Sequence, residues 1–373
     1  MTIKKKEIGL AIIGCGTIGR IRAMIAREYP AVSWLGLCDI KENLARKLGE
    51  DAKADFVTKD FNELIRRPEV TAVIISTDEN FHTAPTLAAI EQGHKIFIEK
   101  PLATDVKESY SILKAIEESG IDAVVGYTNR FRRRFLAIKE RLTTGQIGEV
   151  TTVVARAFMN RMVPIATVRR TDQRKTLTPM VVSGTHCLDM CMWLMEGKTP
   201  VSIYAQSVDK SLKKYGTKDS TLGVFTMDDG TIYSMNISWA LPVVWPGAVY
   251  GLEIGIVGTK GVIDVDDTHR DLVLASEIPQ GAGYKPEGFE PEFQRHIDFL
   301  TSYPPGDICQ EQLWGPMREE TISWLSRIYN EIKTPHATAR DGHRNLTLTM
   351  AMDLSAERGE PLKLPISLDE FYK

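Results

Sequence analysis

Two short motifs place chemically useful residues directly after apolar segments of the chain. The first is GCGTIG at residues 14–19, which follows apolar residues 8–13 and precedes a helical pattern at 20–28. A glycine loop between a strand and a helix suits the pyrophosphate of a dinucleotide, because N–H groups and the positive end of the helix dipole face the phosphates. The second is EKP at 99–101, which puts an ionisable lysine after a later apolar segment. Open α/β sheets bind ligands at the carboxyl ends of their strands, so the pair indicates a nicotinamide-dependent oxidoreductase.

The glycines of the first motif have separate expected roles. Gly14 permits a tight turn, Gly16 lets the backbone approach the phosphates, and Gly19 allows close packing of helix on strand. Asp39 ends the second apolar segment, 20 residues after Gly19, where a carboxylate accepts hydrogen bonds from ribose hydroxyls. It would also repel a 2′-phosphate, so we expect NAD, while Lys41 keeps NADP as an alternative. A loop that only turns the chain, with the aspartate capping the next helix, is the structural alternative. The expected cofactor contacts here are Gly14, Gly16, Thr17, Ile18, Gly19 and Asp39.

The elements that position these motifs follow from the alternation of short apolar and helical segments. The expected buried parallel strands are 8–13, 32–38, 72–76, 95–98 and 123–125. The helical stretches between them are 42–49, 61–67, 83–92 and 106–119. Gly93 and Gly120 stand where helix C-caps are expected. This βαβ rhythm predicts an N-terminal Rossmann domain with a doubly wound parallel sheet over residues 1–125.

The pattern changes after Gly126. A helix at 132–143 precedes the strand-like segments 150–158, 201–208, 221–227, 231–239, 252–257, 261–265 and 271–274. We therefore predict that residues 126–373 form an α+β domain for substrate binding and oligomerisation, whose open-faced, mainly antiparallel β-sheet has one face covered by helices. Later helices are expected at 293–303 and 313–332, and the C-terminal tail is expected to pack back on the Rossmann domain. The uncovered apolar face predicts a homodimer or homotetramer.

Composition narrows the class of protein. A chain of 373 residues suits two domains, and 43% hydrophobic and 25% charged residues are typical of a soluble globular protein. The net charge of -3 predicts neither a nucleic-acid partner nor binding to an acidic membrane. Apolar runs fall short of the roughly 20 residues of a membrane helix, and the start does not resemble a signal peptide, so we expect a cytoplasmic protein.

Cysteine spacing gives no disulfide framework and no metal site. The five cysteines form no CxxC pair, so we expect reduced thiols. Cys187 and Cys191 lie beside His186, but three ligands crowded on about one helical turn could not easily surround a tetrahedral ion. We therefore predict no metal.

Further motifs resemble the glucose–fructose oxidoreductase, inositol dehydrogenase and MocA family over nearly the whole length. The segments that carry this resemblance are GCGTIG at 14–19, STDENFH at 76–82, AAIEQGHKIFIEKPLA at 88–103, GYTNRF at 126–131 and SGTHCLDM at 183–190. The resemblance implies a Rossmann domain and an open-faced sheet domain with the substrate between them. It also implies that Lys100 and His186 lie beside the nicotinamide. The further cofactor-lining residues that it implies are Ser76, Thr77, Asn80, His82 and Glu99.

The proton chemistry of alcohol oxidation suits these side chains. The hydroxyl proton must leave as hydride leaves carbon, and His186 is suited to accept it because an imidazole titrates near neutral pH. Lys100 would stabilise the developing alkoxide charge. Asp189 is spaced i, i+3 from the histidine, and the resemblance implies that it binds a substrate hydroxyl. Many family members carry an aspartate four residues before this histidine, where this chain has Val182, so the histidine must work with the lysine or with a group from elsewhere, such as Asp172.

Two basic segments bear on the substrate. The loop at 165–178 contains Arg169, and the run at 130–134 begins with Arg130. Guanidinium groups bind carboxylates or phosphates, although a solvated or subunit surface is the alternative. We expect an NAD(H)-dependent dehydrogenase that oxidises a secondary hydroxyl of a sugar, cyclitol or sugar derivative. A dihydrodiol dehydrogenase for a cyclic diol and a nicotinamide-binding regulatory protein without turnover remain the alternatives.

Overall fold

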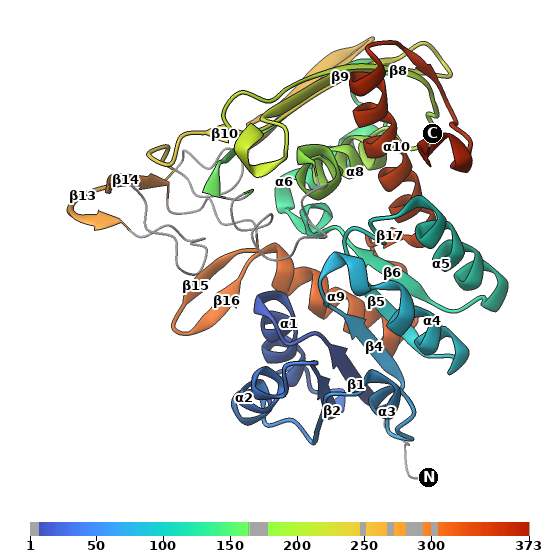
Figure 1. Cartoon of the computed structure of the whole chain (residues 1–373), viewed down its shortest axis with the longest axis vertical. Helices are drawn as coiled ribbons and strands as arrows, with labels where there is room; N and C mark the ends of the chain where they lie inside the picture. The colour runs from blue at the N-terminus through green and yellow to red at the C-terminus, as the bar shows by residue number, and fades with distance from the viewer. Residues whose placement is uncertain are drawn as a thin grey trace. The chain divides into compact units, whose positions relative to one another are not determined.

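The chain forms two compact units, each with a sheet of its own. One contains residues 1–131 and 308–346, and the other contains residues 132–307 and 347–373. The structure is a computed structural model (Figure 1), and the residues that it describes are 7–162, 164, 178–246, 251–266, 272–280, 294–299 and 305–372.

The first unit is built on a seven-stranded sheet in the order β17-β6-β5-β4-β1-β2-β3. The parallel strands are β1 (Ile8–Ile13), β2 (Val32–Cys38), β3 (Phe56–Thr58), β4 (Ala72–Ile75), β5 (Lys95–Glu99) and β6 (Ala123–Gly126). The short strand β17 (Ala337–Thr338) returns from the later segment and pairs antiparallel with β6. The strand order reverses between β1 and β4, so a topological switch point lies at their carboxyl ends.

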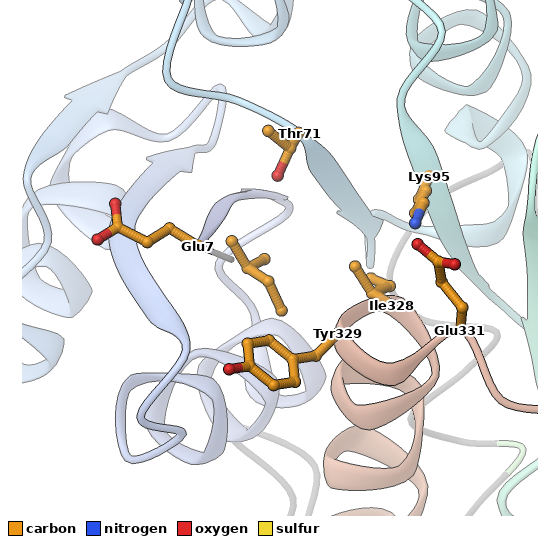
Figure 2. A pocket seen from close by; sticks show the side chains of 7 residues that line it. Glu7, Thr71, Lys95, Ile328, Tyr329 and Glu331 are labelled. Atoms are coloured by element: carbon orange, nitrogen blue, oxygen red, sulfur yellow. The ribbon is translucent and has the colours of Figure 1, made fainter. Parts of the chain in front are cut away.

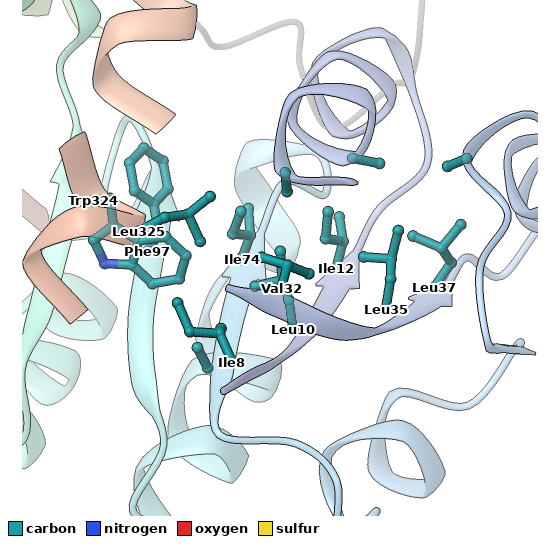
Figure 3. Close-up of a cluster of buried hydrophobic side chains, with 14 of the residues drawn as sticks. Ile8, Leu10, Ile12, Val32, Leu35, Leu37, Ile74, Phe97, Trp324 and Leu325 are labelled. Carbon is teal, nitrogen blue, oxygen red and sulfur yellow. The ribbon is translucent and has the colours of Figure 1, made fainter. Parts of the chain in front are cut away.

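Helices cover both faces of this sheet (Figure 1). The helices on one face are α1 (Thr17–Arg27), α2 (Glu42–Ala52) and α9 (Pro316–Asn330). The helices on the other face are α3 (Phe61–Ile65), α4 (Thr83–Glu91) and α5 (Val106–Ser119). Figure 3 shows the first core, in which Trp324 of α9 meets Phe97 of β5 edge to face at 5.6 Å between ring centroids. The doubly wound architecture predicted for the N-terminal part is confirmed.

The second unit has a seven-stranded sheet in the order β12-β11-β7-β10-β9-β8-β18. Its strands are β7 (Val150–Asn160), β8 (Pro200–Val208), β9 (Ser220–Met227), β10 (Ile232–Leu241), β11 (Gly251–Gly258), β12 (Gly261–Asp266) and β18 (Leu362–Lys363). All neighbours pair antiparallel except β7 and β10, which confirms the mainly antiparallel sheet. The helices α6 (Arg133–Thr143) and α8 (Thr185–Leu194) belong to this unit, and α8 follows the π-helical turn η4 (Met180–Gly184).

The remaining elements are short or lie late in the chain. Two hairpins pair β13 (Val273–Gln280) with β14 (Arg295–Phe299) and β15 (Asp307–Cys309) with β16 (Gln312–Trp314). The long helix α10 covers Ala339–Arg358, and the short 3-10 turns are η1 (Glu79–Phe81), η2 (Thr128–Phe131), η5 (Lys213–Tyr215) and η6 (Leu368–Tyr372). None of the helices in the described ranges combines the length and the apolar character needed to cross a membrane.

Three late elements differ from the prediction. The described part of the predicted helix 293–303 is strand β14, where Ile297 and Phe299 alternate with His296 and Asp298 in the period of two that strands require. The helix predicted at 313–332 begins only at Pro316, because Gly315 before it has φ +119° and a proline favours the first helical position. Helix α10 was not predicted, since its mixed polar and apolar sequence has a weak apolar period.

Histidine burial makes the stability of the first unit depend on pH. His336 lies with Nδ1 2.7 Å from Thr334 Oγ1 and Nε2 3.1 Å from the carbonyl oxygen of Glu320. Burial lowers the pKa of His336 to about 3. The folded pKa is therefore below the unfolded value, so the unfolded chain takes up a proton first as the pH falls below about 6.5, and the native state loses stability there.

We expect the free energy of unfolding of the parent to fall by about 2 kcal/mol more between pH 7 and pH 5 than that of His336→Gln. Chemical denaturation of both proteins at the two pH values measures the difference, and effects of the other histidines cancel. Equal losses in the two proteins would show that His336 titrates normally in the fold.

Candidate functional site

The loops after β1 and β4 meet at the switch point of the parallel sheet. The backbone N–H of Ser76 donates to the carbonyl oxygen of Ile13 at 2.8 Å, and its Oγ donates to the carbonyl oxygen of Gly14 at 2.9 Å. Gly14 has φ +98°, and a Cβ there would stand 2.4 Å from the carbonyl oxygen of Ser76. Gly14 is therefore required by the fold itself, because the two loops touch through their backbones.

The other two glycines of the loop at residues 14–19 differ in whether packing requires them. A Cβ on Gly19 would lie 1.8 Å from the carbonyl oxygen of Gly14, so this glycine lets α1 approach the strand end. A Cβ on Gly16 would meet nothing within 4 Å, and its φ of -68° is open to any residue. Gly16 is exposed, and internal packing does not require a glycine there.

The open space beside Gly16 suits a phosphate. Gly16 is the N-cap of α1, no side chain caps this helix end, and its first turn contains no acidic residue. The free N–H groups and the positive end of the helix dipole therefore lie at this exposed glycine. This arrangement fits the pyrophosphate of a dinucleotide.

Asp39 holds the glycine loop in place. Its Oδ2 accepts from the backbone N–H of Cys15 and its Oδ1 from that of Lys41, both at 2.8 Å. Helix α2 has Lys41 as its N-cap and no capping side chain, so the alternative in which Asp39 caps that helix is wrong. Each carboxylate oxygen keeps a second lone pair, which suits a ribose hydroxyl.

Buried thiols lie behind the same loop. Cys15 and Cys38 are free and buried, and Cys15 Sγ lies 3.5 Å from the carbonyl oxygen of Cys38. Burial, with a contribution from the charge of Asp39, raises the pKa of each thiol to about 12. Both therefore stay neutral and contribute apolar packing. The remaining three cysteines are free as well.

The loop after β4 is tied to the segment that follows β5. His82 is buried, with Nδ1 2.9 Å from the carbonyl oxygen of Pro101 and Nε2 3.3 Å from that of Thr77. Both ring nitrogens face protein carbonyls, and burial lowers the pKa of His82. Asn80 forms a second tie, because its Oδ1 accepts from Thr104 Oγ1 at 2.8 Å. These ties position the two loops, while cofactor contact by Thr77, Asn80 and His82 stays a prediction.

Glu99 is engaged inside the first unit. Its Oε1 accepts from Nε of Arg22 at 2.9 Å, and the same guanidinium contacts Glu320 of α9. This pairing joins α1 to the end of β5, one residue before Lys100. We did not predict Arg22 or Glu320, because they are 298 residues apart and neither belongs to a recognised motif.

His186 and Asp189 lie on α8 of the second unit, which confirms the helical segment that places them on one face. Asp189 is buried and His186 half-buried. The π-helical turn before α8 contains Val182, which is buried and brings no carboxylate to this position. The turn is anchored where Trp239 Nε1 donates to Ser183 Oγ at 2.8 Å. π-Helical turns are frequent at functional sites.

Arg130 is paired inside the protein, and its predicted contact with the substrate stays a prediction. Arg130 is 3% exposed and pairs with Asp341 at 3.4 Å, and its charge helps to lower the pKa of Asp341 against the effect of burial. The structure therefore makes Arg130 part of the interior of the first unit. Arg169 and Asp172 lie outside the described residues. Lys100 belongs to the first unit, whereas His186 and Asp189 belong to the second, and their joint action stays a prediction.

A pocket at the other end of the parallel sheet is separate from these residues (Figure 2). It includes Ile8 and Lys95, which are the first residues of β1 and β5, whereas the glycine loop and Lys100 follow the last residues of the same strands. Its full lining is Glu7, Ile8, Thr71, Lys95, Ile328, Tyr329 and Glu331. None of the predicted site residues lines it.

The family of this chain is shown by two sequence models that match it. One, described as "Oxidoreductase family, NAD-binding Rossmann fold", matches residues 8–127, and the other, described as "GFO/IDH/MocA C-terminal domain", matches residues 135–264. The chain therefore belongs to the GFO/IDH/MocA oxidoreductase family, and the resemblance drawn from its motifs is confirmed.

Individual relatives are similar over nearly the whole chain. The myo-inositol 2-dehydrogenase of Thermotoga maritima is 24% identical over 363 residues, which are 95% of this chain and 98% of that protein. The scyllo-inositol 2-dehydrogenase (NAD(+)) of Bacillus subtilis is 23% identical over 366 residues, which are 96% of this chain and 97% of that protein. The crystal structure of scyllo-inositol dehydrogenase from Lactobacillus casei with bound NAD(H) and scyllo-inositol has the same fold, with a TM-score of 0.75 at 19% identity and coverage of 96% and 99%.

Substitution of Gly16 and of Gly19 should affect different quantities, NADH binding and the free energy of unfolding. Gly16→Ala should weaken binding of NADH at least about 10-fold and leave the free energy of unfolding nearly unchanged, because the new methyl group occupies only open space. Gly19→Ala should lower the free energy of unfolding by about 3 kcal/mol or more, because its methyl group overlaps the backbone of Gly14. NADH fluorescence titration and chemical denaturation measure the two quantities. Unchanged NADH binding by Gly16→Ala would contradict the placement of the phosphates.

Proposed function

We propose that this protein is an NAD(H)-dependent dehydrogenase that oxidises a secondary hydroxyl group of a cyclitol, sugar or sugar derivative. The observation that carries the proposal is the open space at Gly16, where a helix N-terminus faces a gap that no internal packing requires. Membership of an NAD-binding oxidoreductase family supports the cofactor. Relatives named as inositol dehydrogenases support a cyclic polyol as the substrate.

The residues around the cofactor favour NAD. The carboxylate of Asp39 already accepts two backbone N–H groups and has lone pairs left for a ribose hydroxyl. A 2′-phosphate at the same place would bring further negative charge against it, which makes NADP the less favoured cofactor. When bound, NAD supplies the hydride acceptor.

The chain itself would handle the proton of the alcohol. We assign His186 as the base that accepts the hydroxyl proton, since an imidazole is suited to accept a proton near neutral pH. The ammonium group of Lys100 would donate a hydrogen bond to the same oxygen and stabilise the alkoxide as it forms. Asp189 would orient the substrate through a neighbouring hydroxyl. Because Val182 provides no carboxylate, His186 and Lys100 would carry out the proton transfer without one.

Two alternatives use the same cofactor site. A dihydrodiol dehydrogenase would apply the same chemistry to a cyclic diol, which carries the same secondary hydroxyl. A nicotinamide-binding regulatory protein would bind NADH without turnover, and Val182 at the position of the family aspartate is the feature that keeps this reading open.

Lys100→Met should bind NADH within about threefold of the parent and lose at least about 10³-fold in kcat, because the charge that stabilises the alkoxide is gone. NADH absorbance with inositols, sugars, sugar acids and dihydrodiols, each with NAD and NADP, measures turnover. Lys95→Met is the matched control, since Lys95 lies at the other end of the same strand.

The outcomes of this panel separate the alternatives. Turnover of dihydrodiols alone would assign the dihydrodiol dehydrogenase. NADH binding by the parent with no turnover on the whole panel would favour the regulatory protein. Turnover retained by Lys100→Met would contradict the role of this lysine.

We also propose that the protein forms a homodimer or homotetramer through the outer face of the second sheet. Strand register places Val154 of β7, Val224 of β9 and Tyr204 of β8 in one row across this face. Exposed apolar side chains on this face include Val154, Tyr204, Leu222, Val224, Ile232 and Val257, which are 40–57% exposed. Ser234 of β10 interrupts this row, but an exposed sheet face that carries this many apolar side chains is typical of an interface.

Val224→Asp should shift the protein toward monomer at micromolar concentration, because it places a charge in the middle of the apolar face. Multi-angle light scattering measures the mass. Ile332→Asp, an exposed apolar position after α9 in the first unit, is the control and should leave the mass unchanged. A monomeric parent would contradict the assembly.

A further inference from the structure

Three ionisable side chains meet in the interior of the first unit. Arg22 of α1 is 0% exposed, and its Nε and Nη2 lie 2.9 Å and 2.8 Å from Oε1 of Glu99 on β5. Its Nη2 also donates to Oε2 of Glu320 on α9 at 2.5 Å, and its Nη1 donates to Thr321 Oγ1 at 2.7 Å. One guanidinium therefore serves two carboxyl groups, and the fold brings all three together from distant parts of the chain.

The charges of this cluster do not balance when both carboxyl groups are ionised. One positive and two negative charges would leave a net charge of about -1 in a largely buried cluster, which is costly. Glu320 Oε2 accepts from both Arg22 and Thr128 Oγ1, while Oε1 of Glu320 is buried and has no hydrogen-bond partner among the described residues. An ionised carboxylate would leave a charged oxygen buried there without a donor, and burying an unpaired charge costs more than burying the neutral acid with its proton on Oε1, so the geometry favours a neutral carboxyl group at Glu320.

The surrounding groups agree with this assignment. Burial raises the pKa of Glu320 to about 7, with Arg22 opposing the shift and the charge of Glu99 adding to it. His336 faces Glu320 through its backbone carbonyl, and its lowered pKa of about 3 keeps the ring neutral. The other charges near this histidine are those of Arg130 and Arg327. Arg22 stays charged because Glu99 and Glu320 outweigh its burial and raise its pKa.

The cluster joins the two elements that carry the proposed site. Arg22 lies on the helix that begins after Gly16, and Glu99 directly precedes Lys100. With Glu320 neutral, Arg22 pairs fully with Glu99 and holds helix α1 against the end of β5. With Glu320 ionised, one guanidinium must balance two buried negative charges, and the link between helix and strand end weakens.

On the basis of the proposed function, we propose that Glu320 is a positioning residue that, in its neutral form and through Arg22 and Glu99, holds Lys100 and the glycine loop in their working arrangement. Loss of its proton loosens both, so that turnover and NADH binding fall together. Glu320 itself touches neither substrate nor cofactor in this proposal.

The test compares the parent with Glu320→Gln, which keeps the size and hydrogen-bonding oxygen of the neutral acid and does not titrate. The ratio of kcat for Glu320→Gln to kcat for the parent should rise at least about threefold between pH 6 and pH 8.5, and the ratio of the parent's Kd for NADH to that of the variant should rise likewise. Glu319→Gln, an exposed neighbour on the same helix, is the control and should track the parent at every pH. Flat ratios for both quantities would overturn the proposal, even if the unfolding transitions differed.

A second variant tests the proposal if Glu320→Gln does not fold. Thr128→Val removes the hydroxyl that donates to Glu320 Oε2 and should move the inflection of the parent to higher pH, because the ionised form loses a hydrogen bond. An unmoved inflection would count against Glu320 as its origin. If the parent shows no turnover on the substrate panel, the proposed function fails, and the NADH binding ratios still decide the role of Glu320.

Discussion

The close approach of two backbones at the switch point is the constraint on which the rest of the first unit depends. Gly14 and Gly19 let the loop after β1 touch both the loop after β4 and the first turn of α1. Side chains at either position would overlap a carbonyl oxygen. The contact brings the N-terminus of the helix to the carboxyl end of the sheet, and Asp39 then closes the loop from the neighbouring strand. Gly16, which packing does not need, is left facing the space so formed.

Buried polar groups fix the helix and the loops at this end of the sheet. Arg22 fastens the same helix to the end of β5, and His82 fastens the loop after β4 to the segment that begins at Lys100. Helix α9, which follows the second unit's residues along the chain, supplies Glu320 and Trp324 to this interior. The first unit is thus complete only when residues 308–346 return to it. The proposed chemistry depends on residues 308–346, because Glu320 is linked through Arg22 to Glu99, which directly precedes Lys100.

The second unit contributes a different kind of support. Its sheet buries one face against its own core and exposes an apolar row on the other, which is the basis for the proposed assembly. Helix α8 carries His186 and Asp189 after a π-helical turn, and the hydrogen bond from Trp239 to Ser183 fixes that turn to the sheet. Val182 in the turn is buried and apolar. In the proposed mechanism, His186 would accept the proton with help from Lys100 alone.

Local patterns in the sequence were sufficient for most of the architecture. The apolar periodicity predicted the parallel strands and their helices, and the glycine loop, EKP and the His186 segment marked the family. These signals are short-range, because strand alternation, helix starts and motif spacing depend on residues within a few positions of one another. The hairpin at β14 and helix α10 were not predicted, because their sequence patterns are weak and packing against distant segments stabilises them.

Tertiary structure alone decided how the motif residues are used. It turned Arg130 inward to Asp341, gave His82 two carbonyl partners, and set Glu320 beside Arg22 from 298 residues away. It also showed that packing requires a glycine at positions 14 and 19 but not at position 16, although all three belong to one motif. The reason is physical: contact, burial and the balance of charge depend on which distant segments share an interior, and no local spacing records that.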